Sequence, residues 1–329
     1  MMIYRKSALT AAALTLGLSA AQADAQTCSL GLMASLDMTS AGDGAFSVPV
    51  SINGTMHNFL IDTAGMYSQI ASDAAQKIGL KETGQGPELY GAGGKIHLGI
   101  ATADSFKVGN NEAKNFHIGI RHVQPATGSG SGFDGLLAPD MLSLFDVELD
   151  FVKKKMNLFS QDHCPGKVVY WTQGGYAVLP FRFATGQADS HITLDMTLDG
   201  HEMRTDFDTG SSVSTMRKKA AVQIFGVDEN SPGVVKSPHA TAGFPILRKQ
   251  FGSLTFGGLA VQNPQIDILP SAEEDAYRME HSEKSRDDPI YGSYLLTENL
   301  TLGMNVIGKL HVFIAYKERK VYITAADAH

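Results

Sequence analysis

The chain has few cysteines and no concentration of basic residues. Only two of its 329 residues are cysteine, and no spacing of histidines and cysteines typical of a metal site occurs, so we expect neither a metal ion nor another cofactor. Lysine and arginine total 27 against 34 aspartates and glutamates, and no arginine-rich run is present. A net charge of −7 without a basic patch gives nucleic-acid binding little support.

Motifs of several common enzyme classes are missing as well. No H-E-x-x-H sequence is present, and Ser211 lies in no G-x-S-x-G motif, so neither a zinc protease nor a serine hydrolase is indicated. The segment Thr127–Gly132 is rich in glycine and serine but lacks the lysine of a phosphate-binding loop. We interpret it as a surface loop.

Long apolar runs are confined to the N-terminus. Arg5 and Lys6 precede an apolar stretch at residues 8–21, and small residues at 21–25 fit a signal-peptidase cleavage site. Residues 1–25 therefore predict a signal peptide, since the apolar stretch is short for a membrane anchor. No later segment is apolar for long enough to cross a bilayer, and we expect a periplasmic or secreted protein without a membrane span after signal removal.

Both cysteines lie after the expected cleavage site. In an oxidising compartment Cys28 and Cys164 are expected to form one disulfide, which would tie the mature N-terminus to the middle of the chain. The alternative is two unrelated buried thiols.

Glycine, in contrast, is abundant, with 34 residues, and it marks a repeated pattern. The dipeptides Asn53-Gly54 and Asp199-Gly200 are strong hairpin turns, each flanked by alternating apolar residues typical of strands. Eight residues after each glycine comes an aspartate, Asp62 in the first case and Asp208 in the second, 146 positions apart. The chain therefore resembles itself at a long offset.

The same offset relates two predicted helices. Residues Ser72–Ile78 carry alanines and an isoleucine at helical spacing, and Gly79 is a natural stop. Adding 146 leads to residues 220–224, which repeat this spacing and are followed by Gly226.

Later segments match at slightly larger offsets. Ser105–Gly109 corresponds to Ser253–Gly257, and Val147–Leu158 corresponds to Val312–Ile323. The second copy therefore holds extra residues, and we place most of them in an acidic surface loop near Ser271–Pro289.

These matches describe a duplicated domain. Short strands separated by glycine-rich turns, with few and short helices, predict an all-β fold. We place a first lobe at residues 26–165 and a second lobe at residues 166–329, joined by a linker at Gln161–Gly175. Two ordinary domains fit the chain length.

The sequences that begin at the two aspartates indicate a family. Asp62-Thr63-Ala64-Gly65 and Asp208-Thr209-Gly210-Ser211 each follow an apolar strand. This arrangement resembles the aspartic proteases, both pepsin-like and retropepsin-like, in which each lobe offers one such loop. The resemblance covers almost all of the mature chain and is strongest to bacterial secreted retropepsin-like proteins with two modules on one chain.

Further segments extend the resemblance. In the family, a later apolar segment braces each aspartate loop, and Leu136-Leu137-Ala138 and Thr301-Leu302-Gly303 stand in those places. Tyr90-Gly91-Ala92-Gly93 looks like the tyrosine-bearing flap of the first lobe, and Thr241-Ala242-Gly243 occupies the flap position of the second. The alternative for Tyr90 is an ordinary half-buried strand residue.

The resemblance implies an aspartic endopeptidase that binds an extended peptide or protein segment in an active cleft between the lobes. Asp62 and Asp208 would share one proton and activate water, and no cofactor is needed. Thr63 and Thr209 would form hydrogen bonds across the lobe interface and hold the two loops. We expect a monomer, because the duplication supplies both halves of the site on one chain.

The first copy departs from the family pattern. Ala64 replaces a glycine of the aspartate loop, Ala138 replaces the glycine of the brace, and Gly65 stands where the second copy has Ser211. A methyl group in a tight loop shifts the backbone, more so if φ must be positive. These departures motivate a second hypothesis, a catalytically impaired peptide- or protein-binding module. A third and simpler interpretation makes both aspartates ordinary turn residues.

Overall fold

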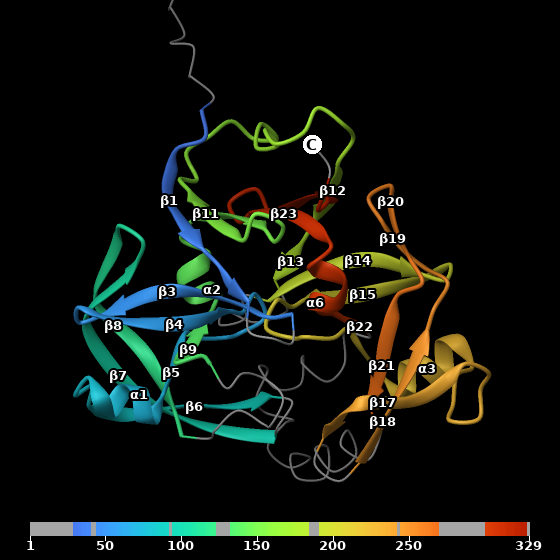
Figure 1. The fold of residues 1–329 in the computed structure, drawn as a ribbon, viewed down its shortest axis with the longest axis horizontal. Coiled ribbons are helices and arrows are strands. Elements are labelled where there is room, and N and C mark those ends of the chain that lie inside the picture. The colour runs from blue at the N-terminus through green and yellow to red at the C-terminus, as the bar shows by residue number, and fades with distance from the viewer. Residues whose placement is uncertain are drawn as a thin grey trace, which may run out of the picture.

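The computed structural model describes residues 29–40, 44–91, 94–122, 132–183, 191–241, 244–269 and 300–327. Most of these residues lie in strands of three sheets, and helices are few and short. Figure 1 shows two β lobes side by side, with a third sheet above them. The all-β, two-lobed prediction is therefore confirmed.

The first lobe is built around an eight-stranded sheet with the order β2-β3-β4-β9-β5-β8-β7-β6. Its strands are β2 (Thr39–Ser40), β3 (Phe46–Ile52), β4 (Thr55–Ile61), β5 (Gln69–Ala71), β6 (Glu82–Gly91), β7 (Gly94–Val108), β8 (Asn111–Arg121) and β9 (Gly135–Leu137). Two short helices, α1 (Ser72–Lys77) and α2 (Pro139–Leu142), follow β5 and β9.

The second lobe repeats this plan in a sheet with the order β17-β18-β21-β16-β22-β15-β14-β19-β20, with β13 beside β14. Its strands are β13 (Arg182–Phe183), β14 (Ile192–Leu198), β15 (His201–Phe207), β16 (Thr215–Arg217), β17 (Val234–Thr241), β18 (Phe244–Gln250), β19 (Ser253–Phe256), β20 (Leu259–Gln262), β21 (Gln265–Leu269) and β22 (Leu300–Leu302). Helices α3 (Lys218–Phe225) and α6 (Met304–Ile307) follow β16 and β22.

The third sheet joins the two halves of the chain. It has the order β1-β11-β10-β23-β24-β12, with β1 (Leu32–Asp37), β10 (Asp146–Asp150), β11 (Lys155–Phe159), β12 (Ala177–Pro180), β23 (Leu310–Ala315) and β24 (Lys320–Ala325). At its centre β10 and β23 run antiparallel, with Val147 opposite Ile314 and Asp150 opposite His311. Three strands from each half thus form one continuous sheet.

The repeated turns have the conformation that their sequences predict. Asn53 and Gly54 have φ of 49° and 87°, and Asp199 and Gly200 have φ of 45° and 85°. Positive φ at both central residues is the requirement of the tight hairpin turn that matches strand twist, and both dipeptides tolerate it. Each turn joins the strand pair that leads to an aspartate.

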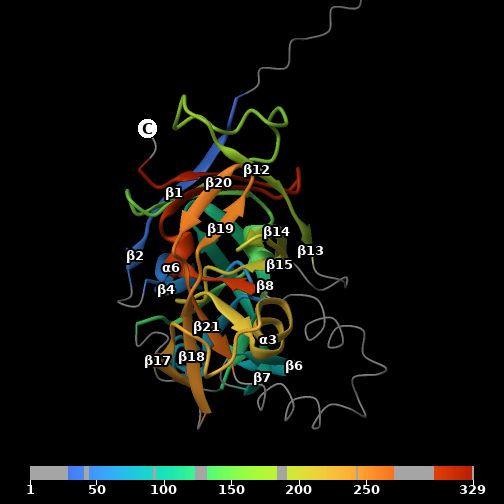
Figure 2. The same cartoon turned by 90° about the vertical axis from the view of Figure 1, so that its right-hand side faces the viewer.

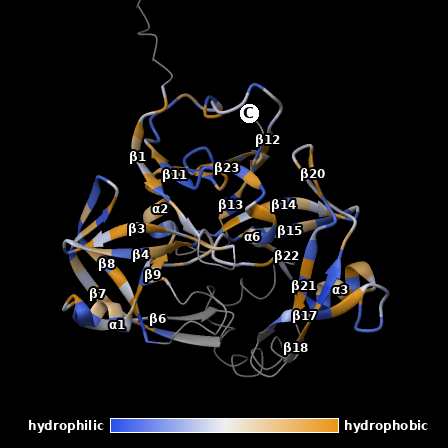
Figure 3. Ribbon diagram, in the orientation of Figure 1, coloured by the Kyte–Doolittle hydropathy of each residue, from blue (hydrophilic) through white to orange (hydrophobic). Residues whose placement is uncertain are grey.

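One hydrophobic cluster runs through both lobes and includes residues of the shared sheet. Every residue of β23 is buried, as is every residue of β10. Figure 3 shows hydrophobic (orange) segments along the strands of both lobes. Burial on this scale fixes the register of the shared sheet and, through it, the relative placement of the two aspartate loops.

Several predictions fall wholly or partly outside the described residues. These are the signal peptide at residues 1–25, Cys28, the extra loop of the second copy, and the flap residues Ala92 and Gly93. The predicted lobe division at 165/166 lies in a segment without strands between β11 and β12 and stays a prediction. Within the described ranges, none of the helices combines the length and the apolar character that crossing a membrane requires.

Candidate active site

Each aspartate lies at the end of a strand that is held by a later segment. β9 is inserted between β4 and β5, parallel to the first and antiparallel to the second, and the Asp62 N–H donates to the Leu137 carbonyl at 3.0 Å. In the second lobe β22 is inserted between β15 and β16 in the same way, and the Asp208 N–H donates to the Leu302 carbonyl at 3.0 Å. The brace segments expected from the sequence therefore lie beside the aspartates.

The two threonines cross from one loop to the other. The Thr63 hydroxyl donates to the Phe207 carbonyl at 2.7 Å and accepts the Thr209 N–H at 3.0 Å. The Thr209 hydroxyl donates to the Ile61 carbonyl at 2.7 Å and accepts the Thr63 N–H at 3.1 Å. Both side chains are buried, so four backbone groups would lose their partners if the loops separated. This reciprocal exchange holds the two loops together.

The carboxyl groups meet beside Gly210. The Ala64 N–H donates to Asp62 Oδ1 at 3.1 Å, and the Gly210 N–H donates to Asp208 Oδ1 at 2.8 Å. A Cβ at Gly210 would lie 2.7 Å from the Asp62 carboxyl carbon and 3.1 Å from Asp208 Oδ1. Glycine is therefore required at position 210, because a side chain there would overlap the two carboxyl groups.

The two carboxyl groups differ in their affinity for protons. Burial raises the pKa of Asp62 to about 6, while backbone hydrogen bonds from Ala64 and Gly65, the charge of Arg121 and a hydrogen bond from Asp208 oppose the rise. Burial and the nearby charge of Asp62 raise the pKa of Asp208 well above its ordinary value. The pKa values of both carboxyl groups are raised, and the charge of Asp62 acts against the ionisation of Asp208, so the pair favours holding one shared proton.

Behind each loop lies a serine that the sequence analysis did not single out. In the first lobe the Ser68 hydroxyl donates to Asp140 at 2.6 Å, the Ser68 N–H donates to the same carboxylate at 2.9 Å, and the Ala138 N–H donates to the serine oxygen at 3.1 Å. Ser68 thus fixes the start of β5 against the end of β9.

The second lobe repeats the arrangement with an amide in place of the carboxylate. The Ser214 N–H and hydroxyl donate to Asn305 Oδ1 at 2.7 and 2.8 Å, and the Gly303 N–H donates to the Ser214 oxygen at 3.0 Å. Ser68 and Ser214 are 146 positions apart, the same offset as the aspartates. That offset was the signal that could have identified both serines.

The alanines of the first copy are accommodated without backbone strain. Ala64 is not among the residues with positive φ, and its N–H makes the same contact as that of Gly210. Ala138 has φ −108° and ψ 174°, and its counterpart Gly303 has φ −105° and ψ −178°, an extended conformation that any residue adopts. The backbone shift expected from Ala138 therefore has no basis in its torsion angles.

Space for the Ala138 methyl group comes from Gly65. A Cβ at Gly65 would lie 3.1 Å from the Ala138 Cβ, closer than ordinary contact. In the second copy the side chain is on the other partner, because Ser211 replaces glycine and Gly303 replaces alanine. The Ser211 hydroxyl donates to the Val213 carbonyl at 2.8 Å. Each copy thus has one glycine at these two positions, but a Cβ at Gly303 would meet the backbone of Val213 and Ser211 and not the Ser211 side chain.

The expected flap residues lie at the end of a long hairpin. Tyr90 and Gly91 end β6, where Tyr90 pairs with Lys95 and Gly91 pairs with Gly94 of β7. Figures 1 and 2 place this hairpin and the β17–β18 hairpin at the end of the molecule opposite the shared sheet. The described backbone is that of a hairpin, as expected for a flap, and the flap role stays a prediction.

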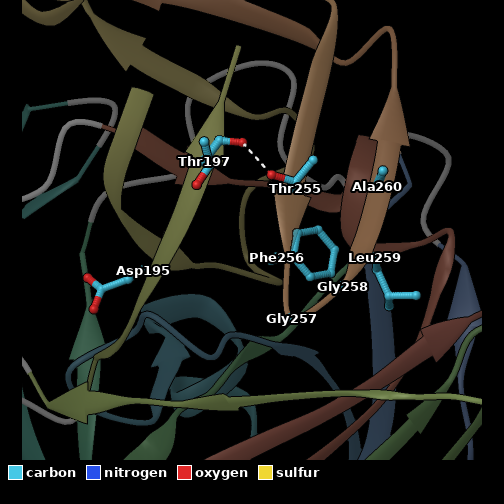
Figure 4. A pocket seen from close by; sticks show the side chains of 8 residues that line it. All are labelled: Asp195, Thr197, Thr255, Phe256, Gly257, Gly258, Leu259 and Ala260. Carbon is cyan, nitrogen blue, oxygen red and sulfur yellow. Dashed lines mark hydrogen bonds between the residues drawn. The ribbon is translucent and has the colours of Figure 1, made fainter. Parts of the chain in front are cut away.

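A separate open pocket lies on the second lobe. Figure 4 shows it between β14, β19 and β20, with a volume of about 370 Å³, and the Thr255 hydroxyl donating to the Thr197 carbonyl at 3.5 Å. Asp195 is the charged residue of its lining, and neither Asp62 nor Asp208 contributes to it. Within the described ranges, no cluster of three or more His, Cys, Asp or Glu residues is suited to a metal ion.

Comparison with known proteins agrees with this geometry. Residues 48–140 match a family model described as aspartyl protease, a range that contains the first aspartate loop and its brace. The structure is similar to that of an aspartic proteinase from Irpex lacteus, with a TM-score of 0.55 and 12% sequence identity, over 89% of this chain and 97% of the other. A search of curated proteins gives no match. Residues 48–140 thus match the aspartyl protease family, and the chain has a fold similar to that of a two-lobed aspartic proteinase.

Proposed function

We propose that this chain is an aspartic endopeptidase that hydrolyses peptide bonds in extended segments of peptides or proteins. The observation that carries the proposal is the pair of carboxyl groups against Gly210, one from each lobe, with pKa values raised to different extents. Two carboxyl groups with separated pKa values are the arrangement from which acid and base roles are assigned.

The proposed mechanism gives each aspartate one role. Asp62, with the lower pKa, is ionised near neutral pH and accepts a proton from the attacking water. Asp208, with its pKa well above the ordinary value, keeps its proton and donates a hydrogen bond to the scissile carbonyl. As the tetrahedral intermediate collapses, Asp62 delivers the proton that it took from water to the leaving nitrogen, and the pair returns to its single-proton state.

The competing hypothesis of an impaired binding module was motivated by Ala64 and Ala138. Ala64 has no positive φ, and Ala138 has nearly the torsion angles of Gly303, so neither alanine supports impairment through backbone strain. We therefore treat binding without hydrolysis as an outcome of the test below.

The test compares the mature chain, residues 26–329, with Asp62→Asn and Asp208→Asn on a mixture of denatured proteins between pH 3 and 8. Asp37→Asn is the matched control, because that aspartate is exposed on β1 at the edge of the shared sheet. Cleavage by the wild type and the control, abolished in both site variants, supports the proposal. Cleavage that survives in either site variant, or no cleavage by folded wild type, contradicts it.

The compartment and the disulfide belong to the same proposal. A signal peptide and an oxidising destination would make Cys28 and Cys164 a disulfide, and the protein would act as a periplasmic or secreted monomer. The intact mass of the secreted protein, measured after thiol alkylation with and without prior reduction, checks the disulfide. Two alkylated cysteines without reduction would refute it.

A further inference from the structure

Two polar side chains near the aspartate loop of the first lobe lie on the same face of the sheet. β5 and β8 run parallel, with Gln69 opposite Gly119 and Ala71 opposite Arg121. Ile70 and Ile120, one position along each strand, are buried in the hydrophobic cluster. Since side chains alternate along a strand, Gln69 and Arg121 project from the opposite face of this strand pair.

Both side chains have a buried polar atom without a partner. Nε of Arg121 and Oε1 of Gln69 are inaccessible to solvent and make no hydrogen bond to any described residue. Gln69 is 4% exposed, and Arg121 is half-buried. Burying a donor or acceptor without a partner is unfavourable, so two of them on one face require an explanation.

The guanidinium lies within electrostatic range of the aspartate pair. Burial raises the pKa of Asp62, and the charge of Arg121 opposes that rise. Burial in turn lowers the pKa of Arg121, and the charge of Asp62 opposes that change. Among the described residues no carboxylate forms a salt bridge with Arg121, and its positive charge acts on Asp62.

Another arginine of the chain shows what a structural role looks like. Arg248 donates from Nε and Nη2 to the two oxygens of buried Asp267, and both groups are satisfied within the protein. Arg121 has no such partner among the described residues. The corresponding position in the second lobe is Leu269, which pairs with Arg217 where the first lobe has Ala71, so the second lobe carries its arginine on the other strand of this pair.

We infer that Gln69 and Arg121 form a subsite that binds an acidic residue of the peptide substrate close to the scissile bond. The inference rests on the proposed function and adds a substrate class to it. The planar guanidinium of half-buried Arg121 matches a carboxylate with two parallel hydrogen bonds from its terminal nitrogens, and Gln69 lies on the same face of the sheet. An aspartate or glutamate in an extended peptide supplies that carboxylate.

The test measures binding, so that it does not depend on catalysis. A set of peptides carries a non-cleavable hydroxyethylene isostere, with glutamate or glutamine placed at one position at a time, from three residues before the isostere to three after it. Wild type is compared with Arg121→Leu, which introduces the residue of the second lobe. Arg204→Leu is the matched control, because Arg204 is exposed on β15.

Wild type is expected to prefer glutamate over glutamine about tenfold at one position of the peptide. That preference should fall to about twofold or less in Arg121→Leu and remain in Arg204→Leu. Arg121→Glu should instead favour lysine at the same position, a reversal that a merely structural arginine does not produce. Circular dichroism establishes that each variant is folded.

The outcomes separate this inference from the proposed function. Cleavage by the wild type without an acidic preference at any position overturns the subsite and leaves the protease standing. An acidic preference that depends on Arg121, without cleavage of any substrate, supports the subsite and overturns the protease. A preference that persists in Arg121→Leu assigns the recognition to other residues and refutes the inference.

Discussion

Replacing Gly303 by alanine tests how the brace holds the second aspartate loop. The new Cβ would lie 2.4 Å from both the carbonyl carbon and the carbonyl oxygen of Val213, about an ångström inside ordinary contact. Because these are backbone atoms, no rotamer change relieves the overlap. A smaller unfolded-state entropy favours alanine by about 0.4–1 kcal/mol, but overpacking typically costs about 1–3 kcal/mol, and an overlap with backbone atoms lies at the upper end of that range. The overlap therefore outweighs the entropy gain, and we expect Gly303→Ala to lower the free energy of unfolding by about 2 kcal/mol.

The first lobe provides the matched experiment. Ala138 has the same backbone conformation, so Ala138→Gly removes a buried methyl group without creating an overlap. Lost burial and greater freedom of the unfolded chain predict a cost of about 1–2 kcal/mol. Urea unfolding followed by circular dichroism and by fluorescence of the single tryptophan measures both changes. A Gly303→Ala variant within about 0.5 kcal/mol of wild type would refute the packing argument, because Val213 would then have yielded at little cost.

Three further predictions concern the loops and the charges. Thr209→Val leaves the Ile61 carbonyl and the Thr63 N–H buried without partners and should cost about 2–5 kcal/mol in urea unfolding, while Thr209→Ser should cost less than about 1 kcal/mol. The rate kcat/KM should rise with pH through about 6, where Asp62 ionises, so an optimum below pH 4 would contradict the assigned roles. His163→Gln should lower stability most below about pH 6.5 and progressively less at higher pH, as followed by unfolding at pH 6, 7, 8 and 9.

The sign of the last prediction follows from the contacts of His163. Burial alone would lower the pKa of His163, but hydrogen bonds to the Asp146 carboxylate and the Cys164 carbonyl raise it. A carbonyl only accepts, and the ionised carboxylate accepts as well, so both ring nitrogens carry protons and the imidazole is charged. The raised pKa contributes stability that is complete below the unfolded-state value of 6.5 and is lost as pH rises through the folded-state value. A variant whose deficit grows between pH 6 and 9 would contradict this assignment.

The sequence identifies the repeated elements because their signals are local. Asn53-Gly54 and Asp199-Gly200 allow the positive φ of a tight hairpin turn, and this is a property of the dipeptide itself. Gly226 ends α3 in a left-handed conformation for the same kind of local reason. Each aspartate lies eight residues after the glycine of its turn, so the positions of the turns predict that Asp62 and Asp208 occupy equivalent places in the two lobes.

Contacts between distant segments are not predictable in this way. The register of the shared sheet, such as Val147 opposite Ile314, depends on segments from both halves of the chain. β10 alternates acidic and apolar residues, yet all of them are buried, so its alternation does not reveal a buried face. Arg121 was missed for a related reason. A single arginine at the end of a strand forms no recognisable sequence pattern. Its importance is visible only in the structure, where its Nε is buried without a hydrogen bond to a described residue and its charge interacts with Asp62 from another element.

The two copies differ at the positions where the aspartate loop approaches the brace, which are Gly65 and Ala138 in the first copy and Ser211 and Gly303 in the second. In the first, Gly65 leaves space for Ala138, and in the second, Gly303 leaves space beneath the Ser211 loop. In the first copy Gly65 and Ala138 belong together, because a Cβ at Gly65 would press on that of Ala138, whereas Gly303 is required by the Val213 backbone. Considering Ala138 without Gly65 therefore overstates its effect. Gly65→Ser places a Cβ 2.9 Å from Asp62 Oδ2 and 3.1 Å from the Ala138 Cβ, so the double variant with Ala138→Gly should recover only the part of the lost stability that comes from Ala138.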